Sequence, residues 1–464
     1  MNHELDLPPD RMREIGYRVV DHIVEHLATL RDQRVGTKGD PSTLLASLRE
    51  PPPEVGSDFE SVLDQVARQV LCQTMHVNHP RFLSYVPGPS NYISVMADAL
   101  AAGYNVFAGT WVSGSGAAAV ELTVIDWLRE FCGFPVGSGG LFVSGGTMAN
   151  LTALAVARYV KMGGHAEGAT VYYSDQAHSS LEKALRVIGI PSVNLRKLPS
   201  DQNYRLPVRD LVQWIEKDRN AGKRPFCVIA NAGTTNTGAV DPLPELRRLC
   251  HERDLWLHVD GAYGAAAVIS QRGRELLAGL DLADSLSLDP HKWLFQPFET
   301  GCVLVRNQTH LRDTFQILPE YLKDTHQHSA EFNFTDHGLQ LTRAFRALKL
   351  WMSIKVFGLA AFRAAVERGF ELADFTEDCL RAMPGWEVVT PAQMGVVCFQ
   401  YSRADDTAHL KLVQTMIQDG FALITSTVLR GKTVLRTCTI NPRTTEEDIK
   451  ESLKRLDGFA RELA

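Results

Sequence analysis

The feature that most constrains this chain is a series of short apolar runs between residues 86 and 305, none of which has a polar face. The runs lie at residues 141–143, 170–173, 227–230, 255–259 and 302–305, and helix-like segments separate them. A strand without a polar face is typically covered on both sides, and strands that alternate with helices form parallel or mixed sheets. The pattern therefore predicts an α/β unit whose ligands bind at the carboxyl ends of the strands.

Two amphipathic helices are predicted before this unit. Apolar side chains recur at helical spacing over residues 10–31, and a capping box formed by Ser57 and Glu60 begins a second striped helix. A linker over residues 37–56, with three consecutive prolines, joins them. Because two such helices cannot bury their own apolar faces, we expect them to pack either on another subunit or on the body of the chain.

A small α+β domain is predicted after the sheet. A long helical stretch over residues 339–380, interrupted at Gly358 and Gly369, leads out of it. Predicted strands at 396–401, 421–429 and 432–440 then combine with helices at 408–418 and 446–463, the last capped by Thr444 and Glu447. The expected parts are an N-terminal helical segment (1–85), a large α/β domain (86–355) and a small C-terminal domain (356–464).

The composition points to a small-molecule partner. The 464 residues carry a net charge of -6 with both signs mixed along the chain, so no basic patch for nucleic acid or an anionic membrane is expected. The eight cysteines are scattered without a Cys-x-x-Cys pair, which favours buried thiols in a reducing compartment and no metal site. The acidic N-terminus and the lack of a long apolar stretch predict a cytoplasmic protein.

Two charged residues at strand ends are candidates for chemistry. Asp260 ends the apolar run at 255–259, and an unpaired buried charge there would cost several kcal/mol. Pro290 ends a second short strand and delivers His291 and Lys292 at its carboxyl end. One strand-helix-strand unit spans the separation between Asp260 and Lys292, so the two could face one site. Taken alone, a helix cap or an ion pair explains Asp260 equally well, and a solvated surface explains Lys292 better.

Further polar groups follow other predicted strands. The segment 144–150 contains Gly146 and Thr147 before a helix, which is a plausible cradle for a phosphate at the helix N-terminus. A second polar turn covers residues 233–238, and His178 follows the strand at 170–173. A phosphate cradle, a buried aspartate, an imidazole and a lysine are the groups that pyridoxal phosphate requires.

The chain resembles the group II pyridoxal-phosphate-dependent decarboxylases, in the branch related to aromatic-L-amino-acid decarboxylase. The resemblance runs from about residue 10 to the C-terminus, through the segments 79–82, 174–179, 256–263, 289–293 and 343–351. It implies a PLP-dependent aminotransferase-like fold (fold type I) and the cofactor pyridoxal 5'-phosphate. It also implies a homodimer whose N-terminal helices exchange across the interface.

The resemblance assigns roles to matching positions. It implies that Lys292 forms a Schiff base with the cofactor, Asp260 partners the pyridine nitrogen and His178 stacks on the ring. The cofactor-binding set it implies is completed by Ala262, Gly146, Thr147, Thr235, Asp289 and His291. Relatives of the aromatic branch often carry asparagine at the position of Asp289, and an ionised carboxylate would repel phosphate, so the role of Asp289 stays open.

Tyr321 matches the loop tyrosine that protonates the substrate carbon after carbon dioxide leaves. Related aldehyde synthases lack this tyrosine or replace the stacking histidine. Both residues are present here, so the resemblance favours decarboxylation to an amine over an aldehyde synthase.

The predicted substrate residues are Tyr85, Gly88, Phe107 and Trp111. Gly88 and Gly109 are smaller than the residues that aromatic-acting relatives tend to have, and so are Val77 and Val86. Two interpretations stay open: an aromatic amino acid in a wider pocket, or a different substrate such as an acidic amino acid.

Overall fold

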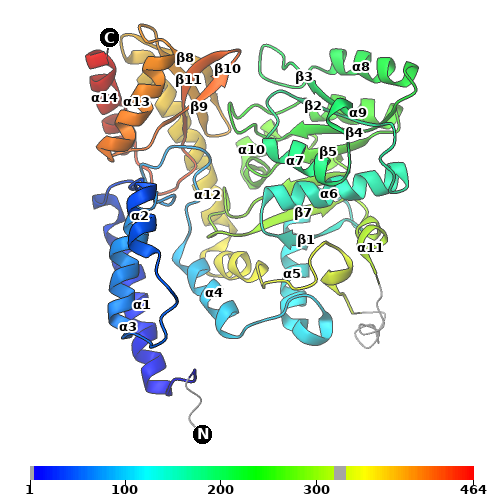
Figure 1. Cartoon of the computed structure of the whole chain (residues 1–464). Coiled ribbons are helices and arrows are strands. Elements are labelled where there is room, and N and C mark those ends of the chain that lie inside the picture. The colour runs from blue at the N-terminus through cyan, green and yellow to red at the C-terminus, as the bar shows by residue number, and fades with distance from the viewer. Residues whose placement is uncertain (1–4, 318–330, 464) are drawn as a thin grey trace.

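The structure, a computed structural model, describes residues 5–317 and 331–463 (Figure 1). Its centre is a seven-stranded mixed sheet with the strand order β1-β7-β6-β5-β4-β2-β3. The strands are β1 (Gly139–Val143), β2 (Ala169–Ser174), β3 (Leu195–Leu198), β4 (Arg224–Asn231), β5 (Trp256–Asp260), β6 (Ser285–Leu288) and β7 (Gly301–Val305). β7 pairs antiparallel with both neighbours, and the other pairs are parallel. The carboxyl ends of β1, β2, β4, β5 and β6 therefore lie along one edge of the sheet.

Helices cover this sheet, as the strands without a polar face require. They are α4 (Tyr92–Gly103), α5 (Trp111–Phe131), α6 (Gly146–Met162), α7 (Ser179–Val187), α8 (Val208–Asn220), α9 (Leu243–Glu252), α10 (Gln271–Leu276) and α11 (Thr309–Phe315). α6 packs across β4, β5, β6 and β7, and Figure 1 shows it in front of the strands. Every residue of β1, β2, β5, β6 and β7 is buried, so the predicted α/β class is confirmed.

One long helix, α12 (Ala347–Ala382), joins the large and small parts of the chain. The predicted interruption at Gly358 is present as a kink with φ of 75°, whereas the one predicted at Gly369 is wrong. Gly369 is helical and buried. The helix packs so closely on the ring of Trp293 that a Cβ at position 369 would lie 3.1 Å from Trp293 Cζ2. The helix also begins later than predicted. The expected boundary between residues 355 and 356 falls inside α12, close to the kink, and stays a prediction.

The C-terminal part is a four-stranded antiparallel sheet in the order β10-β11-β9-β8, packed against α12 and two further helices. Its elements are β8 (Trp386–Gln393), β9 (Val396–Tyr401), α13 (Asp406–Asp419), β10 (Thr425–Leu429), β11 (Lys432–Cys438) and α14 (Glu446–Leu463). The edge strands β3 and β8 were not predicted, because each is partly exposed and lacks a continuous apolar run.

Two predicted helix caps are displaced by one residue. Asp58, not Ser57, caps the second N-terminal helix by accepting from the Ser61 N–H. At α14, Thr445 and Asp448 exchange the capping hydrogen bonds that were expected of Thr444 and Glu447. Ser57 and Asp58 are both good capping residues, and so are Thr444 and Thr445, so the sequence pattern could not show which residue of each pair is the cap.

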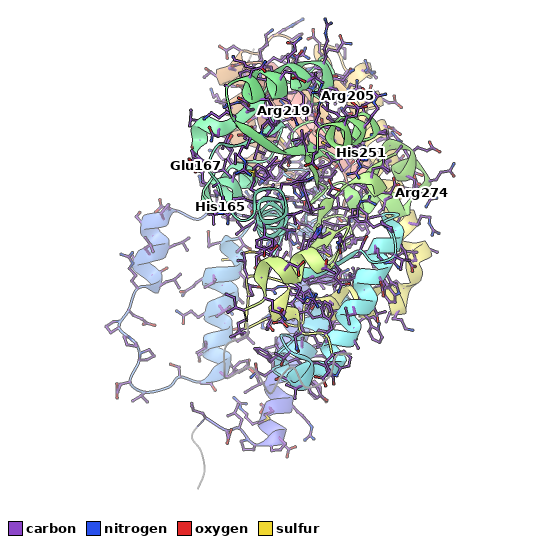
Figure 2. The ribbon with its side chains drawn as sticks, turned by 90° about the vertical axis from the view of Figure 1, so that its right-hand side faces the viewer. His165, Glu167, Arg205, Arg219, His251 and Arg274 are labelled. Carbon is purple, nitrogen blue, oxygen red and sulfur yellow. The ribbon has the colours of Figure 1, made fainter. Side chains whose placement is uncertain are left out.

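The N-terminal segment stands apart from the body of the chain. It contains α1 (Pro9–Thr29), α2 (Pro41–Leu48) and α3 (Phe59–Gln65), which continues as a helical turn over Val66–Val70. α2 lies within the predicted linker, where Asp40 caps it. None of these three helices has a buried residue, and both views show the segment projecting from the molecule (Figures 1 and 2). No helix in the described part of the chain is long and apolar enough to span a membrane.

Candidate active site

A cavity of about 340 Å³ opens at the carboxyl edge of the central sheet. All nine residues predicted to bind a cofactor line it: Gly146, Thr147, His178, Thr235, Asp260, Ala262, Asp289, His291 and Lys292. They follow β1, β2, β4, β5 and β6, so the common direction of these strands gathers residues that are far apart in the sequence.

Asp260 is the last residue of β5 and is held by three donors. Oδ1 accepts from the Ala262 N–H and the Ser287 hydroxyl, both at 3.1 Å, and Oδ2 accepts from Asn150 Nδ2 at 3.0 Å. The carboxylate is 7% exposed, and its hydrogen bonds offset the cost of burial. A buried, oriented carboxylate at the cavity wall is suited to a cationic partner group.

Lys292 faces Asp289, not Asp260, in an ion pair. Lys292 Nζ lies 2.8 Å from Asp289 Oδ2, and His291 Nε2 lies 3.6 Å from the same oxygen. Asp289 is buried, and among the described residues its Oδ1 has no hydrogen-bond partner. Asp289 therefore neutralises the lysine that sequence analysis singled out.

The N-terminus of α6 lines the cavity beside Asp289. Its N-cap is Gly145, which has no side chain to cap the first turn, so the first backbone N–H groups stay available for an anion. Gly146 allows close packing here, because a Cβ would lie 2.9 Å from both Ala262 Cβ and Asp289 Oδ2. An uncapped helix N-terminus at one side and a carboxylate at another fit the phosphate and the pyridine ring of the predicted cofactor.

His178 is the N-cap of α7, and its imidazole lines the cavity. Its Nδ1 lies 2.8 Å from the Ser180 hydroxyl and accepts the Ser180 N–H at 3.2 Å. Burial lowers the pKa of His178 below its usual value, and the nearby Asp260 charge opposes that shift. The ring is therefore positioned by one of its nitrogens.

The predicted substrate residues do not line this cavity. Tyr85 is 63% exposed, and the N–H of Trp111 donates to Asn333. The wider pocket expected beside Gly88 and Gly109 stays a prediction. A Cβ on Gly88 would lie 2.9 Å from Phe298 Cζ, and one on Gly109 would lie 2.6 Å from Phe107 Cε1, so aromatic rings fill both spaces. Tyr321 lies outside the described residues.

Several cavity residues were missed in the sequence. They are Ser180, Asn231, Tyr263 and Glu299, whereas Ser144, Gly145 and Met148 lie in the predicted cradle at 144–150 and Gly233 and Thr234 lie in the predicted polar turn at 233–238. Asn231 ends β4 as Asp260 ends β5, and this shared position was a usable signal. Phe298, which is not in the wall of this cavity, had none, because only the fold brings it against Gly88 and tilts it against His291 with ring centroids 4.9 Å apart.

Comparison with known proteins agrees with this geometry. Residues 41–402 match the model of the pyridoxal-dependent decarboxylase conserved domain. The chain belongs to this family. It is 48% identical to an aromatic-L-amino-acid decarboxylase of Bacillus atrophaeus, with 100% of this chain and 98% of that protein covered. It is 31% identical to a phenylacetaldehyde synthase of Arabidopsis thaliana, covering 96% and 95%.

A crystal structure of Oryza sativa TDC with PLP and tryptamine superposes with a TM-score of 0.93 at 27% identity, covering 100% of this chain and 99% of that one. The predicted family, the fold type I architecture and the cofactor are confirmed. The protein is a pyridoxal-phosphate-dependent amino-acid decarboxylase, and the decarboxylase relative is much more similar than the aldehyde synthase.

Proposed function

We propose that this enzyme decarboxylates an aromatic L-amino acid to the corresponding amine and carbon dioxide. The observation that carries the proposal is the 48% identity, over the whole chain, to a protein named for that activity.

The residues of the cavity divide the work. When bound, the cofactor supplies an aldehyde that bonds to amines and a ring that accepts the electron pair released with carbon dioxide. Lys292 would bind the aldehyde, and the N–H groups of Gly146 and Thr147 would bind the phosphate with the help of Thr235. Asp260 would keep a proton on the ring nitrogen, His178 would cover one face of the ring, and Ala262 would leave room beneath it.

His291 and Tyr321 have separate proposed roles. His291 lies where a Cβ on Gly145 would come within 3.1 Å of its Cε1, and its ring packs at a tilt against Phe298, which supports a role in shaping the cavity beside Lys292. Tyr321, matched by the family pattern, would return a proton to the substrate carbon. Tyr85, Gly88, Phe107 and Trp111 would contribute to substrate binding only in an assembly or a closed state that brings them to the cavity.

We also propose a homodimer in which the N-terminal helices pack on the partner subunit. The uncovered apolar side chains of α1 and α3 support it, because such faces are stable only when covered. The eight cysteines, all free, suit the reducing conditions of the cytoplasm, where we propose that the enzyme works.

A screen of the common amino acids for carbon dioxide release tests the proposal. We expect turnover with one or more of tryptophan, tyrosine and phenylalanine, without hydrogen peroxide or ammonia. Peroxide and ammonia in amounts equal to carbon dioxide would instead show an aldehyde synthase. Lys292→Ala should lower carbon dioxide release at least about a thousandfold and abolish the visible absorbance of the bound cofactor. Release at the parent rate would overturn the role of Lys292.

A further inference from the structure

A continuous hydrogen-bonded chain runs beneath the cavity, from Trp256 on β5 to His178 at the start of α7. Its centre is Asn150, a residue of α6 that is completely buried. The amide of Asn150 contacts three polar side chains: Asp260 at 3.0 Å, Ser180 at 3.2 Å and His258 at 2.9 Å.

The direction in which hydrogen bonds are donated along this chain follows from two groups: one can only donate, and the other can only accept. The indole N–H of Trp256 can only donate, and it donates to the Ser285 hydroxyl at 2.8 Å. The Ser285 hydroxyl proton is then free for His258 Nδ1, which lies 2.9 Å away. This arrangement leaves the proton of His258 on Nε2, which faces Asn150 Oδ1. Burial lowers the pKa of His258 to about 4, so the ring is neutral and has a single proton to place.

The other end gives the same direction independently. A carboxylate only accepts, so the Asn150 atom that faces Asp260 must be the amide nitrogen and not the oxygen. The second hydrogen on that nitrogen is directed to the Ser180 hydroxyl oxygen. The hydroxyl proton of Ser180 is thereby left for His178 Nδ1, at 2.8 Å, and the Ser180 backbone N–H also donates to Nδ1.

We propose that Asn150 is a positioning residue that joins Asp260 and His178 into one hydrogen-bonded unit and keeps the proton of His178 on Nε2. His178 Nδ1 receives two donors and has no place for a proton of its own. In the described part of the chain, Nε2 makes no hydrogen bond, so it is left as a donor for the cavity. Burial lowers the pKa of His178 and outweighs the charges around the ring, of which Asp260 and Asp289 raise the pKa and Lys292 and Lys183 lower it, so the ring is neutral.

This inference deepens the proposed function, since it concerns how Asp260 and His178 are held for the cofactor. Its direct test does not depend on turnover. The full-length enzyme is produced with histidine whose ring nitrogens carry the NMR-active heavy isotope. The two ring nitrogens of His178 are then observed by NMR with and without pyridoxal phosphate. The signal is assigned by its loss in His178→Gln. We expect a protonated Nε2 and an unprotonated Nδ1 in both states, whereas a proton on Nδ1 would overturn the proposal.

Two substitutions of Asn150 separate polarity from packing. Asn150→Asp keeps the shape but replaces both donors by acceptors, and Asn150→Leu keeps the volume without polarity. We expect both to give a mixture of His178 tautomers and to raise the Kd for pyridoxal phosphate at least about tenfold, as expected for losing a hydrogen bond to a charged group. An Asn150→Asp variant with the parent tautomer and a Kd within twofold of the parent would refute the assignment.

Thr376→Val is the matched control. Thr376 is equally buried, lies on α12 and donates only to the Leu372 carbonyl, so its loss should lower thermal stability without changing the His178 signals or the Kd.

Ser180→Ala removes one hydroxyl and keeps the proposal testable if the Asn150 variants do not fold. It should also yield mixed His178 tautomers, and an unchanged single tautomer would count against the proposed hydrogen-bonded unit. Should the His178 tautomer be as expected in an enzyme that releases no carbon dioxide, the proposed function fails and this inference stands.

Discussion

At the residue scale, the ion pair between Lys292 and Asp289 is the least expected feature of the cavity. Asp289 lies beside the N-terminus of α6, where an anion is expected to bind, and yet it carries a carboxylate. Its pairing with Lys292 at 2.8 Å explains how that charge is tolerated when the site holds no ligand. Phosphate binding must then be favourable enough to outweigh the repulsion.

Asp289→Asn should therefore tighten cofactor binding. Removing one charge near the phosphate is worth about 1 kcal/mol at solvent-like screening, so we expect the Kd for pyridoxal phosphate to fall about fivefold. Titration of the cofactor-free enzyme, followed by fluorescence, measures this. A weaker affinity in the variant would mean that the carboxylate itself helps to bind the cofactor. Glu299→Gln, a charge removal at the outer wall of the cavity, is the control and should change the Kd less.

At the element scale, the glycine-rich start of α6 is required by close packing. Gly146→Ala would bring a methyl group to 2.9 Å from Ala262 Cβ, so the helix N-terminus must shift away from the cavity. We expect the Kd for pyridoxal phosphate to rise about tenfold or more, because N–H groups bind anions only at short range. Gly116→Ala on α5, where nothing lies within 4 Å of the added Cβ, should leave the Kd unchanged. Equal Kd values for the two variants would contradict the phosphate role of this element.

The loop that leads from the N-terminal segment into the body contains a buried histidine. His79 Nδ1 accepts the Arg81 N–H at 3.0 Å, and its Nε2 faces the Gln33 carbonyl at 3.2 Å, so the ring is neutral with a proton on Nε2. Burial, and next the Arg81 charge, lower the pKa of His79 to about 4.

Acid should consequently destabilise the protein. A histidine with a folded pKa of about 4 and an unfolded pKa of about 6.5 binds fewer protons when folded between these values. Its contribution is complete above about pH 6.5 and is lost as the pH falls toward 4, amounting to roughly 3 kcal/mol. Melting temperatures measured between pH 7 and pH 4 test this. In His79→Gln, the melting temperature should fall less steeply as the pH is lowered.

The control for this measurement is His165→Gln. His165 is an exposed residue on the outer surface of the large domain (Figure 2), and its replacement should leave the pH dependence unaltered. Parallel curves for the parent and His79→Gln would show that His79 does not titrate in this range.

At the scale of the whole molecule, the projecting N-terminal segment exposes apolar side chains that the proposed dimer would cover. Val62, Val66 and Val70 are 43%, 37% and 39% exposed along one continuous helical stretch. Burying an aspartate in an interface costs several kcal/mol. Val62→Asp combined with Val66→Asp should therefore weaken the proposed dimer at least about a hundredfold, as measured by sedimentation velocity.

Val136→Asp is the control for this pair. Val136 is 92% exposed in the turn after α5, away from the N-terminal helices, and its replacement should leave the dimer intact. A dimer that persists in the double variant would show that these helices do not form the interface, and a monomeric parent enzyme would exclude the dimer altogether.

The amino-acid sequence by itself determined the class of fold and most of the cofactor cavity. Strands covered on both faces leave a local signature in their composition, and parallel strands bring their carboxyl ends to one edge whatever the details of packing. Asp260, His178 and Lys292 could therefore be placed together from their positions after predicted strands.

Only the tertiary structure decided which of these side chains touch. Lys292 pairs with Asp289, Phe298 fills the space beside Gly88, and Asn150 lies between Asp260 and His258. The contacts of Phe298 and Asn150 join segments that are distant in the chain, and their distances depend on how helices pack on the sheet. Lys292 and Asp289 are only three residues apart, and there the fold decides that the lysine pairs with Asp289 and not with Asp260. Periodicity reports which face of an element is buried, but it carries no information about which neighbour covers that face.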